Sequence, residues 1–222
     1  MELSHKGQKL IHFYQEMAEN GYDTRSGSMV DTAYNTFELR KFRLVCRPLF
    51  QQAKIKSVLD YGGGGSDWSA PGFDQETGQS AQQYFDLEAA EVYEPARDLN
   101  NTSVADCVVC MDVLEHIFVC DLPKIIQNLF SLAQKLLVIN VACYEANALL
   151  PNVENAHVTV RDPMWWRGII DGVAVSFPST MVMLICSDTY TSGIIYVPYA
   201  AADWYSSPRF TTDLSHTRFA AQ

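Results

Sequence analysis

The sequence predicts an α/β fold built on an open, mostly parallel sheet flanked by helices, with an antiparallel strand at one edge and additional helices at the N-terminus. Short apolar runs typical of buried strands alternate with stretches of helical periodicity, as βαβ units require. The last two predicted strands are separated only by the polar stretch SDTYTSG, which predicts an antiparallel hairpin. Helical periodicity also occupies much of the first fifty residues.

Two or three helices are expected before the first strand. Apolar residues recur at helical spacing in GQKLIHFYQEMAEN and in TFELRKFRLVCRPLFQQA, and the second stretch is expected to leave the helix near Pro48 or shortly after. Between them, GYDTRSGSMVDTAYN is polar and rich in turn-forming residues, which is typical of a mobile segment or lid. Residues 1–54 are therefore predicted to form an N-terminal helical and lid segment.

The main domain is predicted over residues 55–200. SVLDY, AEVYEP, ADCVVCMD and KLLVINVA are typical of strands, and SFPSTMVMLICS and GIIYVPYA of the closing hairpin. SAQQYF predicts a helical turn, and DLPKIIQNLFSLA an amphipathic helix. PMWWRGIIDG predicts a second helix, opening at Pro163 and closing at Gly172. Residues 201–222 are expected to form a C-terminal tail.

Composition and charge exclude several classes of partner. The 222 residues carry a formal net charge of -10, and the lysines and arginines are scattered, so a nucleic-acid backbone would be repelled. The apolar runs fall far short of the ~20 residues that span a bilayer. The first residues, MELSHKGQKL, lack the apolar region of a secretory signal. We expect a cytoplasmic protein that binds neither nucleic acid nor membrane.

The six cysteines are predicted to be structural. Four lie inside apolar runs, where a free cysteine behaves as a small hydrophobe. In a strand, Cys107 and Cys110 of the CVVC sequence would point to opposite faces and could not share one tetrahedral zinc. No second CxxC sequence occurs, and no metal site is predicted.

Four consecutive glycines, Gly62–Gly65, follow the first predicted strand. Glycine loses the most conformational entropy on folding, so the run indicates a sharp turn or the close approach of a ligand. The dinucleotide pattern GxGxxG would require glycine where Asp67 stands, and a phosphate-binding GxxxxGK[ST] loop would require a lysine that is missing. Both phosphate-binding patterns therefore fail.

VLDYGGGGS resembles the first motif of class I S-adenosylmethionine-dependent methyltransferases, (V/L)LDxGxGxG, with Ser66 in place of the third glycine. The resemblance implies the Rossmann-like fold of that family and S-adenosylmethionine as the cofactor. It also implies that cofactor-binding residues include Asp60, Gly62, Gly63 and Gly64. The cofactor carries a cationic amine and a sulfonium but no phosphate, so a carboxylate and backbone carbonyls suit it.

Two further segments carry the same resemblance. AEVYEPAR is similar to the family's second strand, which implies that Glu94 binds both ribose hydroxyls. Glu94 lies 32 residues after Gly62, against the usual ~20, and the insert at 70–79 accounts for the difference. ADCVVCMDVLEHI is similar to the family's DxVxxxxVLEHI segment and adds Asp112 and Val113 to the cofactor site. Asp112 could equally cap the following helix.

The stretch NALLPNVENAHVTVRDPMWWRGII resembles a segment of some bacterial and phage methyltransferases of unassigned substrate. His116 and His157 are the catalytic candidates, because histidine titrates near neutral pH. The alternatives are a solvated Glu115–His116 surface pair and an ordinary loop histidine at 157. The adjacent Trp165 and Trp166 cannot both face the core, and Trp68 could either cover the cofactor or pack.

The predicted reaction is transfer of a methyl group to an oxygen or nitrogen of a small-molecule acceptor, with a saccharide preferred. Residues around Tyr22–Tyr34 are expected to close over the acceptor. Later aromatic residues could stack on its ring: Trp165, Trp166, Tyr196, Tyr199, Trp204 and Tyr205. The alternatives are a non-catalytic module that binds S-adenosylmethionine or S-adenosylhomocysteine, and a nicotinamide dehydrogenase, which Asp67 disfavours.

Overall fold

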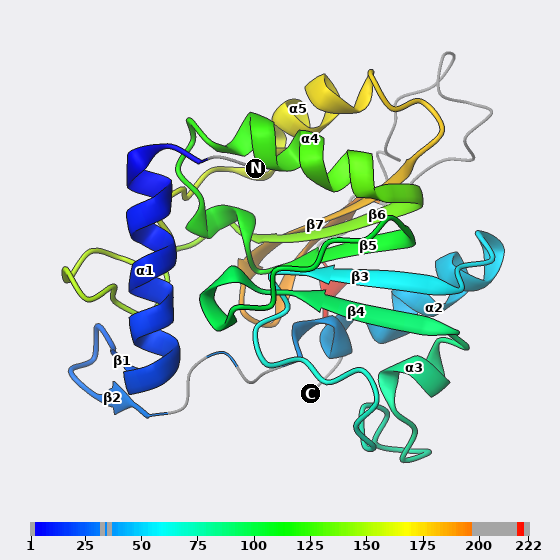
Figure 1. The fold of residues 1–222 in the computed structure, drawn as a ribbon, viewed down its shortest axis with the longest axis horizontal. Helices are drawn as coiled ribbons and strands as arrows, with labels where there is room; N and C mark the ends of the chain where they lie inside the picture. The colour runs from blue at the N-terminus through cyan, green and yellow to red at the C-terminus, as the bar shows by residue number, and fades with distance from the viewer. Residues whose placement is uncertain (1–2, 32–33, 35–36, 197–216, 220–222) are drawn as a thin grey trace.

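The computed structural model describes residues 3–31, 34, 37–196 and 217–219, and its centre is a seven-stranded sheet of order β4-β3-β5-β6-β7-β8-β9 (Figure 1). Five neighbouring strands are parallel: β3 (Ser57–Tyr61), β4 (Ala89–Tyr93), β5 (Ala105–Met111), β6 (Ala133–Ala142) and β7 (Met181–Thr189). β8 (Ser192–Tyr196) is antiparallel to β7, and β9 (Thr217–Arg218) is antiparallel to β8. The predicted α/β class, mostly parallel sheet and closing hairpin are confirmed.

The chain order reverses at β3. β4 lies on one side of β3 and β5 on the other, so the connections that leave β3 and β5 diverge. In open α/β sheets such a switch point leaves a crevice at the carboxyl ends of the strands, where ligands bind. Gly62 and Asp112 directly follow these two strands and therefore face the crevice.

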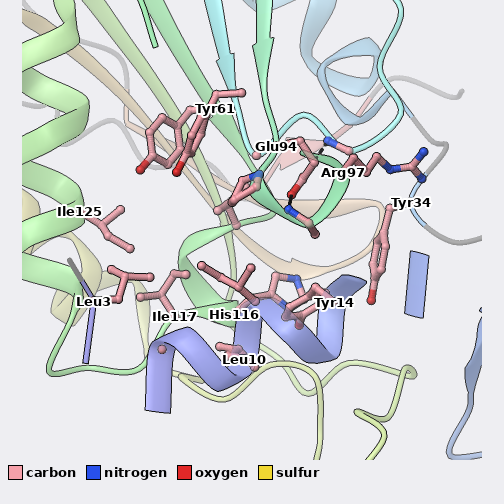
Figure 2. Close-up of a pocket in the computed structure, with 18 of the residues that line it drawn as sticks. Leu3, Leu10, Tyr14, Tyr34, Tyr61, Glu94, Arg97, His116, Ile117 and Ile125 are labelled. Carbon is pink, nitrogen blue, oxygen red and sulfur yellow. Dashed lines mark hydrogen bonds between the residues drawn. The ribbon is translucent and has the colours of Figure 1, made fainter. Parts of the chain in front are cut away.

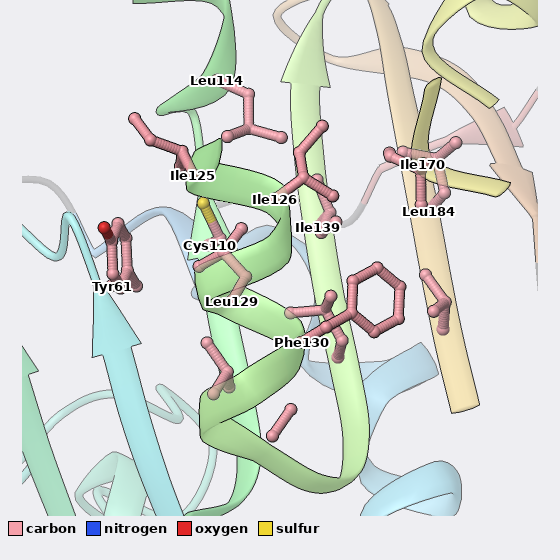
Figure 3. Packing of buried hydrophobic residues seen from close by; sticks show 14 of the residues in the cluster. Tyr61, Cys110, Leu114, Ile125, Ile126, Leu129, Phe130, Ile139, Ile170 and Leu184 are labelled. Atoms are coloured by element: carbon pink, nitrogen blue, oxygen red, sulfur yellow. The ribbon is translucent and has the colours of Figure 1, made fainter. Parts of the chain in front are cut away.

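Helices cover both faces of the sheet. α4 (Leu122–Leu132) and α5 (Pro163–Ala174) pack on one face, and the 3-10 turn η1 (Glu38–Phe42), α2 (Arg43–Gln52) and α3 (Ala81–Tyr84) on the other. α4 buries Ile125, Ile126 and Leu129 because residues three and four apart share one helix face (Figure 3).

The strands that these helices cover are buried on both faces. Cys107 belongs to the core layer beneath α2 and Cys110 to the layer beneath α4, as the alternation of a strand predicts. All six cysteines are free, and Cys120 is exposed.

α1 (His5–Asn20) lies across the carboxyl ends of the strands (Figure 1). Its N-cap residue Ser4 donates a hydroxyl hydrogen bond of 2.6 Å to Asp121 at the start of α4, and its backbone N–H donates to the same carboxylate at 2.8 Å. The helix also packs against η2 (Pro95–Arg97), the 3-10 turn after β4. α1 is thereby fixed as a wall of the crevice.

The polar segment after α1 contains a short hairpin of β1 (Tyr22–Asp23) and β2 (Met29–Val30). Thr24 forms an isolated bridge with Ala148, which joins this hairpin to the loop after β6. The segment predicted as a lid therefore contains regular structure that contacts the rest of the protein.

Two features differ from prediction. α2 ends at Gln52, shortly after Pro48 as predicted, but α5 ends at Ala174 rather than at Gly172. Part of the predicted tail joins the sheet as β9, and Phe219 packs on Phe42 with ring centroids 4.8 Å apart. Residues 201–216 and 220–222 lie outside the described part. In that described part, none of the helices has the length and apolar character needed to cross a bilayer.

Candidate functional site

The glycine corner, Gly62–Gly65, turns the chain sharply after β3. Gly62 and Gly64 have φ angles of +77° and +56°, which glycine adopts without the steric cost of a side chain. A Cβ atom at Gly62 would lie 2.5 Å from a methyl of Val113, and one at Gly64 would lie 2.6 Å from the Tyr34 carbonyl oxygen. Protein packing alone thus requires glycine at both positions.

The Asp60 side chain packs against the backbone of the glycine corner. A Cβ atom at Gly63 would lie 2.7 Å from its carboxylate, which accepts a hydrogen bond of 3.0 Å from the indole N–H of Trp68. Burial raises the pKa of Asp60 to about 7, although hydrogen bonds from Trp68 and Ser66 oppose the shift. Trp68 is buried, which supports the interpretation that it packs in the protein rather than covering a cofactor.

Glu94 follows β4 and bonds directly to the glycine corner. One carboxylate oxygen accepts the Gly64 N–H and the other accepts the Ala96 N–H, both at 3.0 Å (Figure 2). Burial raises the pKa of Glu94, although these two hydrogen bonds and the positive charge of Arg97 act to lower it. Because a carboxylate oxygen has two lone pairs, each oxygen can still accept a second hydrogen bond from a ligand.

Two cavities meet at the corner. The smaller one, about 150 Å³, lies between α1 and the ends of β3 and β4, and Figure 2 shows Leu10 and Tyr14 of α1 reaching toward it. The larger one, about 610 Å³, lies between the corner, the hairpin of β1 and β2, and the loop after β6. The two cavities share Tyr34, Gly62, Gly64, Asp112 and His116.

Carboxyl groups outnumber basic side chains in the lining of the two cavities. Five carboxylates line them: Glu38, Asp60, Glu94, Asp112 and Asp121. Arg97 is the one lysine or arginine among the lining residues in the described chain. Such a field favours cationic ligands and disfavours phosphates.

Asp112 lines both cavities and has a φ of +60°. The following 3-10 turn, η3 (Leu114–His116), has Val113 as its N-cap and no side-chain cap hydrogen bond, so the capping interpretation of Asp112 is wrong. Burial acts to raise the pKa of Asp112, but the neighbouring His116 and a hydrogen bond with the Glu115 carboxyl group outweigh it, and the pKa is lowered. Asp112 is therefore an anion at neutral pH.

Glu115 is fully buried, so the predicted solvated Glu115–His116 pair is wrong. The tight turn of η3 directs Glu115 toward β6, where its carboxyl group accepts the Ala142 N–H. Burial, reinforced by the negative charge of Asp112, raises the pKa of Glu115 well above its ordinary value.

The two predicted catalytic histidines lie edge to face, with ring centroids 4.8 Å apart. Nδ1 of His157 lies 2.5 Å from the carbonyl oxygen of Tyr144. Nδ1 of His116 lies 3.0 Å from the carbonyl oxygen of Ala156. The Tyr14 hydroxyl also contacts His116 Nδ1, at 2.5 Å. Burial and the nearby His157 lower the pKa of His116 to about 4, so its ring is neutral near pH 7.

The structure brings all nine predicted site residues together around the crevice: Asp60, Gly62, Gly63, Gly64, Glu94, Asp112, Val113, His116 and His157. Tyr14 and Tyr144 were missed, because no local pattern places α1 or the loop after β6 at the crevice.

The later aromatic residues do not line either cavity where the structure describes them. Trp166 and Tyr196 are buried in the core, and Trp165 packs partly against it. Of the adjacent tryptophans only Trp166 is fully buried, in agreement with the prediction that both cannot face the core, and Trp165 lines neither of the two cavities. The remaining aromatic candidates lie outside the described residues: Tyr199, Trp204 and Tyr205.

Comparisons of the chain with models of protein families, with curated proteins and with solved structures found no match. Function is therefore inferred from the geometry and chemistry of the two cavities.

Proposed function

We propose that the protein is an S-adenosylmethionine-dependent methyltransferase of the class I type, acting on an oxygen or nitrogen of a small-molecule acceptor. One observation carries the proposal: a glycine corner at the sheet's switch point is bonded to Glu94 within an acidic crevice. S-adenosylmethionine has an ammonium, a sulfonium and a ribose diol, and lacks phosphate. Each of these features suits the crevice.

The donor is assigned to the glycine corner. Glu94, with one free lone pair on each oxygen, would accept both ribose hydroxyls. Asp112, the anion shared by both cavities, would attract the cationic methionine end of the donor. A dinucleotide would instead place its pyrophosphate among these carboxylates, with Arg97 as the one cationic lining residue among those described.

The acceptor is assigned to the larger cavity, which His116 and His157 line. Its oxygen or nitrogen attacks the methyl carbon in line with the sulfur, the new bond forms as the carbon–sulfur bond breaks, and S-adenosylhomocysteine leaves. Alignment supplies most of the catalysis, and an imidazole nitrogen of His116 or His157 takes the acceptor's proton.

Tyrosines also line the acceptor cavity. Tyr22 and Tyr34 stack with ring centroids 5.8 Å apart, and Tyr144 and Tyr190 line the same cavity. Flat aromatic rings with a polar hydroxyl suit the apolar faces and hydroxyl edges of a saccharide. A saccharide therefore remains the preferred acceptor, recognised by these tyrosines rather than by the later tryptophans.

Methyl-labelled S-adenosylmethionine distinguishes an enzyme from a module that only binds the cofactor. The wild-type protein, incubated with the donor and the small-molecule fraction of a cell extract, should release label into a new compound. His157→Gln should retain donor binding and lose most of the transfer, whereas His12→Gln, at an exposed position on α1, should transfer as wild type. Donor binding without any transfer would favour the binding module.

A further inference from the structure

We propose that Asp112, His116 and His157 form a binding site for one divalent first-row transition-metal ion at the wall of the larger cavity. One ligand atom from each side chain lies within 4.8 Å of the other two. The residues come from the end of β5, from η3 and from a loop more than forty residues farther along the chain, so the fold brings them together.

The hydrogen bonds of the two rings prepare them as ligands. A carbonyl oxygen can only accept, so we assign the ring hydrogen to Nδ1 in both histidines, donating to Ala156 from His116 and to Tyr144 from His157. The lone pair is then left on Nε2 of each ring. A metal-binding histidine commonly has its second nitrogen fixed by a backbone carbonyl in this way.

The donor set identifies the class of ion. Two imidazole nitrogens and one carboxylate suit zinc, iron, manganese or cobalt, whereas calcium and magnesium prefer oxygen ligands alone. Bonds of about 2.1 Å place neighbouring ligand atoms roughly 3–3.5 Å apart. Ligand atoms as far apart as 4.8 Å would therefore draw closer together by roughly 1–2 Å on binding, through side-chain rotations.

Three protein ligands leave coordination positions open, and all three residues line the larger cavity. An ion held there would bind an oxygen of a molecule in that cavity and lower the pKa of that oxygen's proton. In methyl transfer this would replace the free histidine as the means of activating a hydroxyl acceptor, and Asp112 would then hold the ion instead of attracting the cationic end of the donor. The metal site itself does not rest on the proposed methyltransferase function.

The test uses the full chain, stripped of metal with a chelator and titrated calorimetrically with zinc. We expect one site in the wild type, and an affinity roughly 100-fold or more weaker in Asp112→Asn and in His157→Ala. Cys120→Ser and His12→Ala control for the exposed thiol and for an exposed histidine, and both should bind as wild type. Equal zinc affinity in wild type and His157→Ala would overturn the proposal.

Cobalt binding to the wild-type protein provides a second measurement, which does not depend on the folding of any variant. Visible absorption without a thiolate-to-metal charge-transfer band is expected, because the proposed ligands are nitrogen and oxygen. A thiolate band, or the absence of saturable cobalt binding, would contradict the site. Both measurements are made without the methyl donor, so their outcome is independent of the test for methyl transfer.

Discussion

Asp60→Asn tests the physical state of the carboxyl group beneath the glycine corner. Burial raises the pKa of Asp60 from 3.8 to about 7 in the folded protein. Because the folded pKa is the higher one, the carboxyl group's contribution to stability is fully present below pH 4 and is lost as the pH rises through 7. At about 1.4 kcal/mol per pH unit, roughly 2–3 kcal/mol should be lost between pH 5 and pH 8.

The asparagine variant does not titrate, and its side-chain oxygen can still accept the Trp68 N–H. Urea unfolding of both proteins, followed by tryptophan fluorescence at pH 5, 6, 7 and 8, gives the difference in unfolding free energy at each pH. That difference should move by about 2–3 kcal/mol in favour of the variant as the pH rises. Asp23→Asn removes an exposed carboxylate and is the matched control. A difference that stays constant over the whole range would refute the assignment of a raised pKa to Asp60.

Two further predictions concern the same corner. Gly62→Ala should cost more unfolding free energy than Gly72→Ala, because both incur roughly 1–2 kcal/mol for a positive φ but only Gly62 adds a clash with Val113. Adding Val113→Ala to Gly62→Ala should relieve the clash. Equal losses of unfolding free energy in Gly62→Ala and Gly72→Ala, measured by urea unfolding, would contradict the prediction. Glu94→Gln should destabilise the fold by about 1–3 kcal/mol by leaving a backbone N–H unpaired, and should weaken donor binding in calorimetry. Glu88→Gln, at an exposed position before the start of β4, should do neither.

The sheet could be predicted because its signals are local. Apolar runs bounded by turns fix the strands, and strand alternation alone placed Cys107 and Cys110 in opposite core layers. The glycine corner was also predictable, since four glycines at the end of a buried strand have few structural explanations. Its neighbours Val113 and Tyr34 were not identified as reasons for glycine, because they contact it only in the folded chain.

The environment of the two histidines could not be predicted in the same way. α1 reaches the crevice through the bonds of Ser4 to Asp121, which lies 117 residues away, and only this placement brings Tyr14 to His116. Glu115 turns inward within a three-residue 3-10 turn, which is too short to show any periodicity in the sequence. The composition of a segment therefore suggested solvent exposure where the fold produces complete burial.

Calorimetric titration of the wild-type protein with S-adenosylmethionine, with NADH and ATP as comparison ligands, tests the central claim most directly. An acidic crevice around the glycine corner should bind one S-adenosylmethionine per chain and neither phosphate-bearing ligand. Binding of NADH or ATP, or no binding of S-adenosylmethionine at all, would contradict the assignment of the corner to a sulfonium nucleoside.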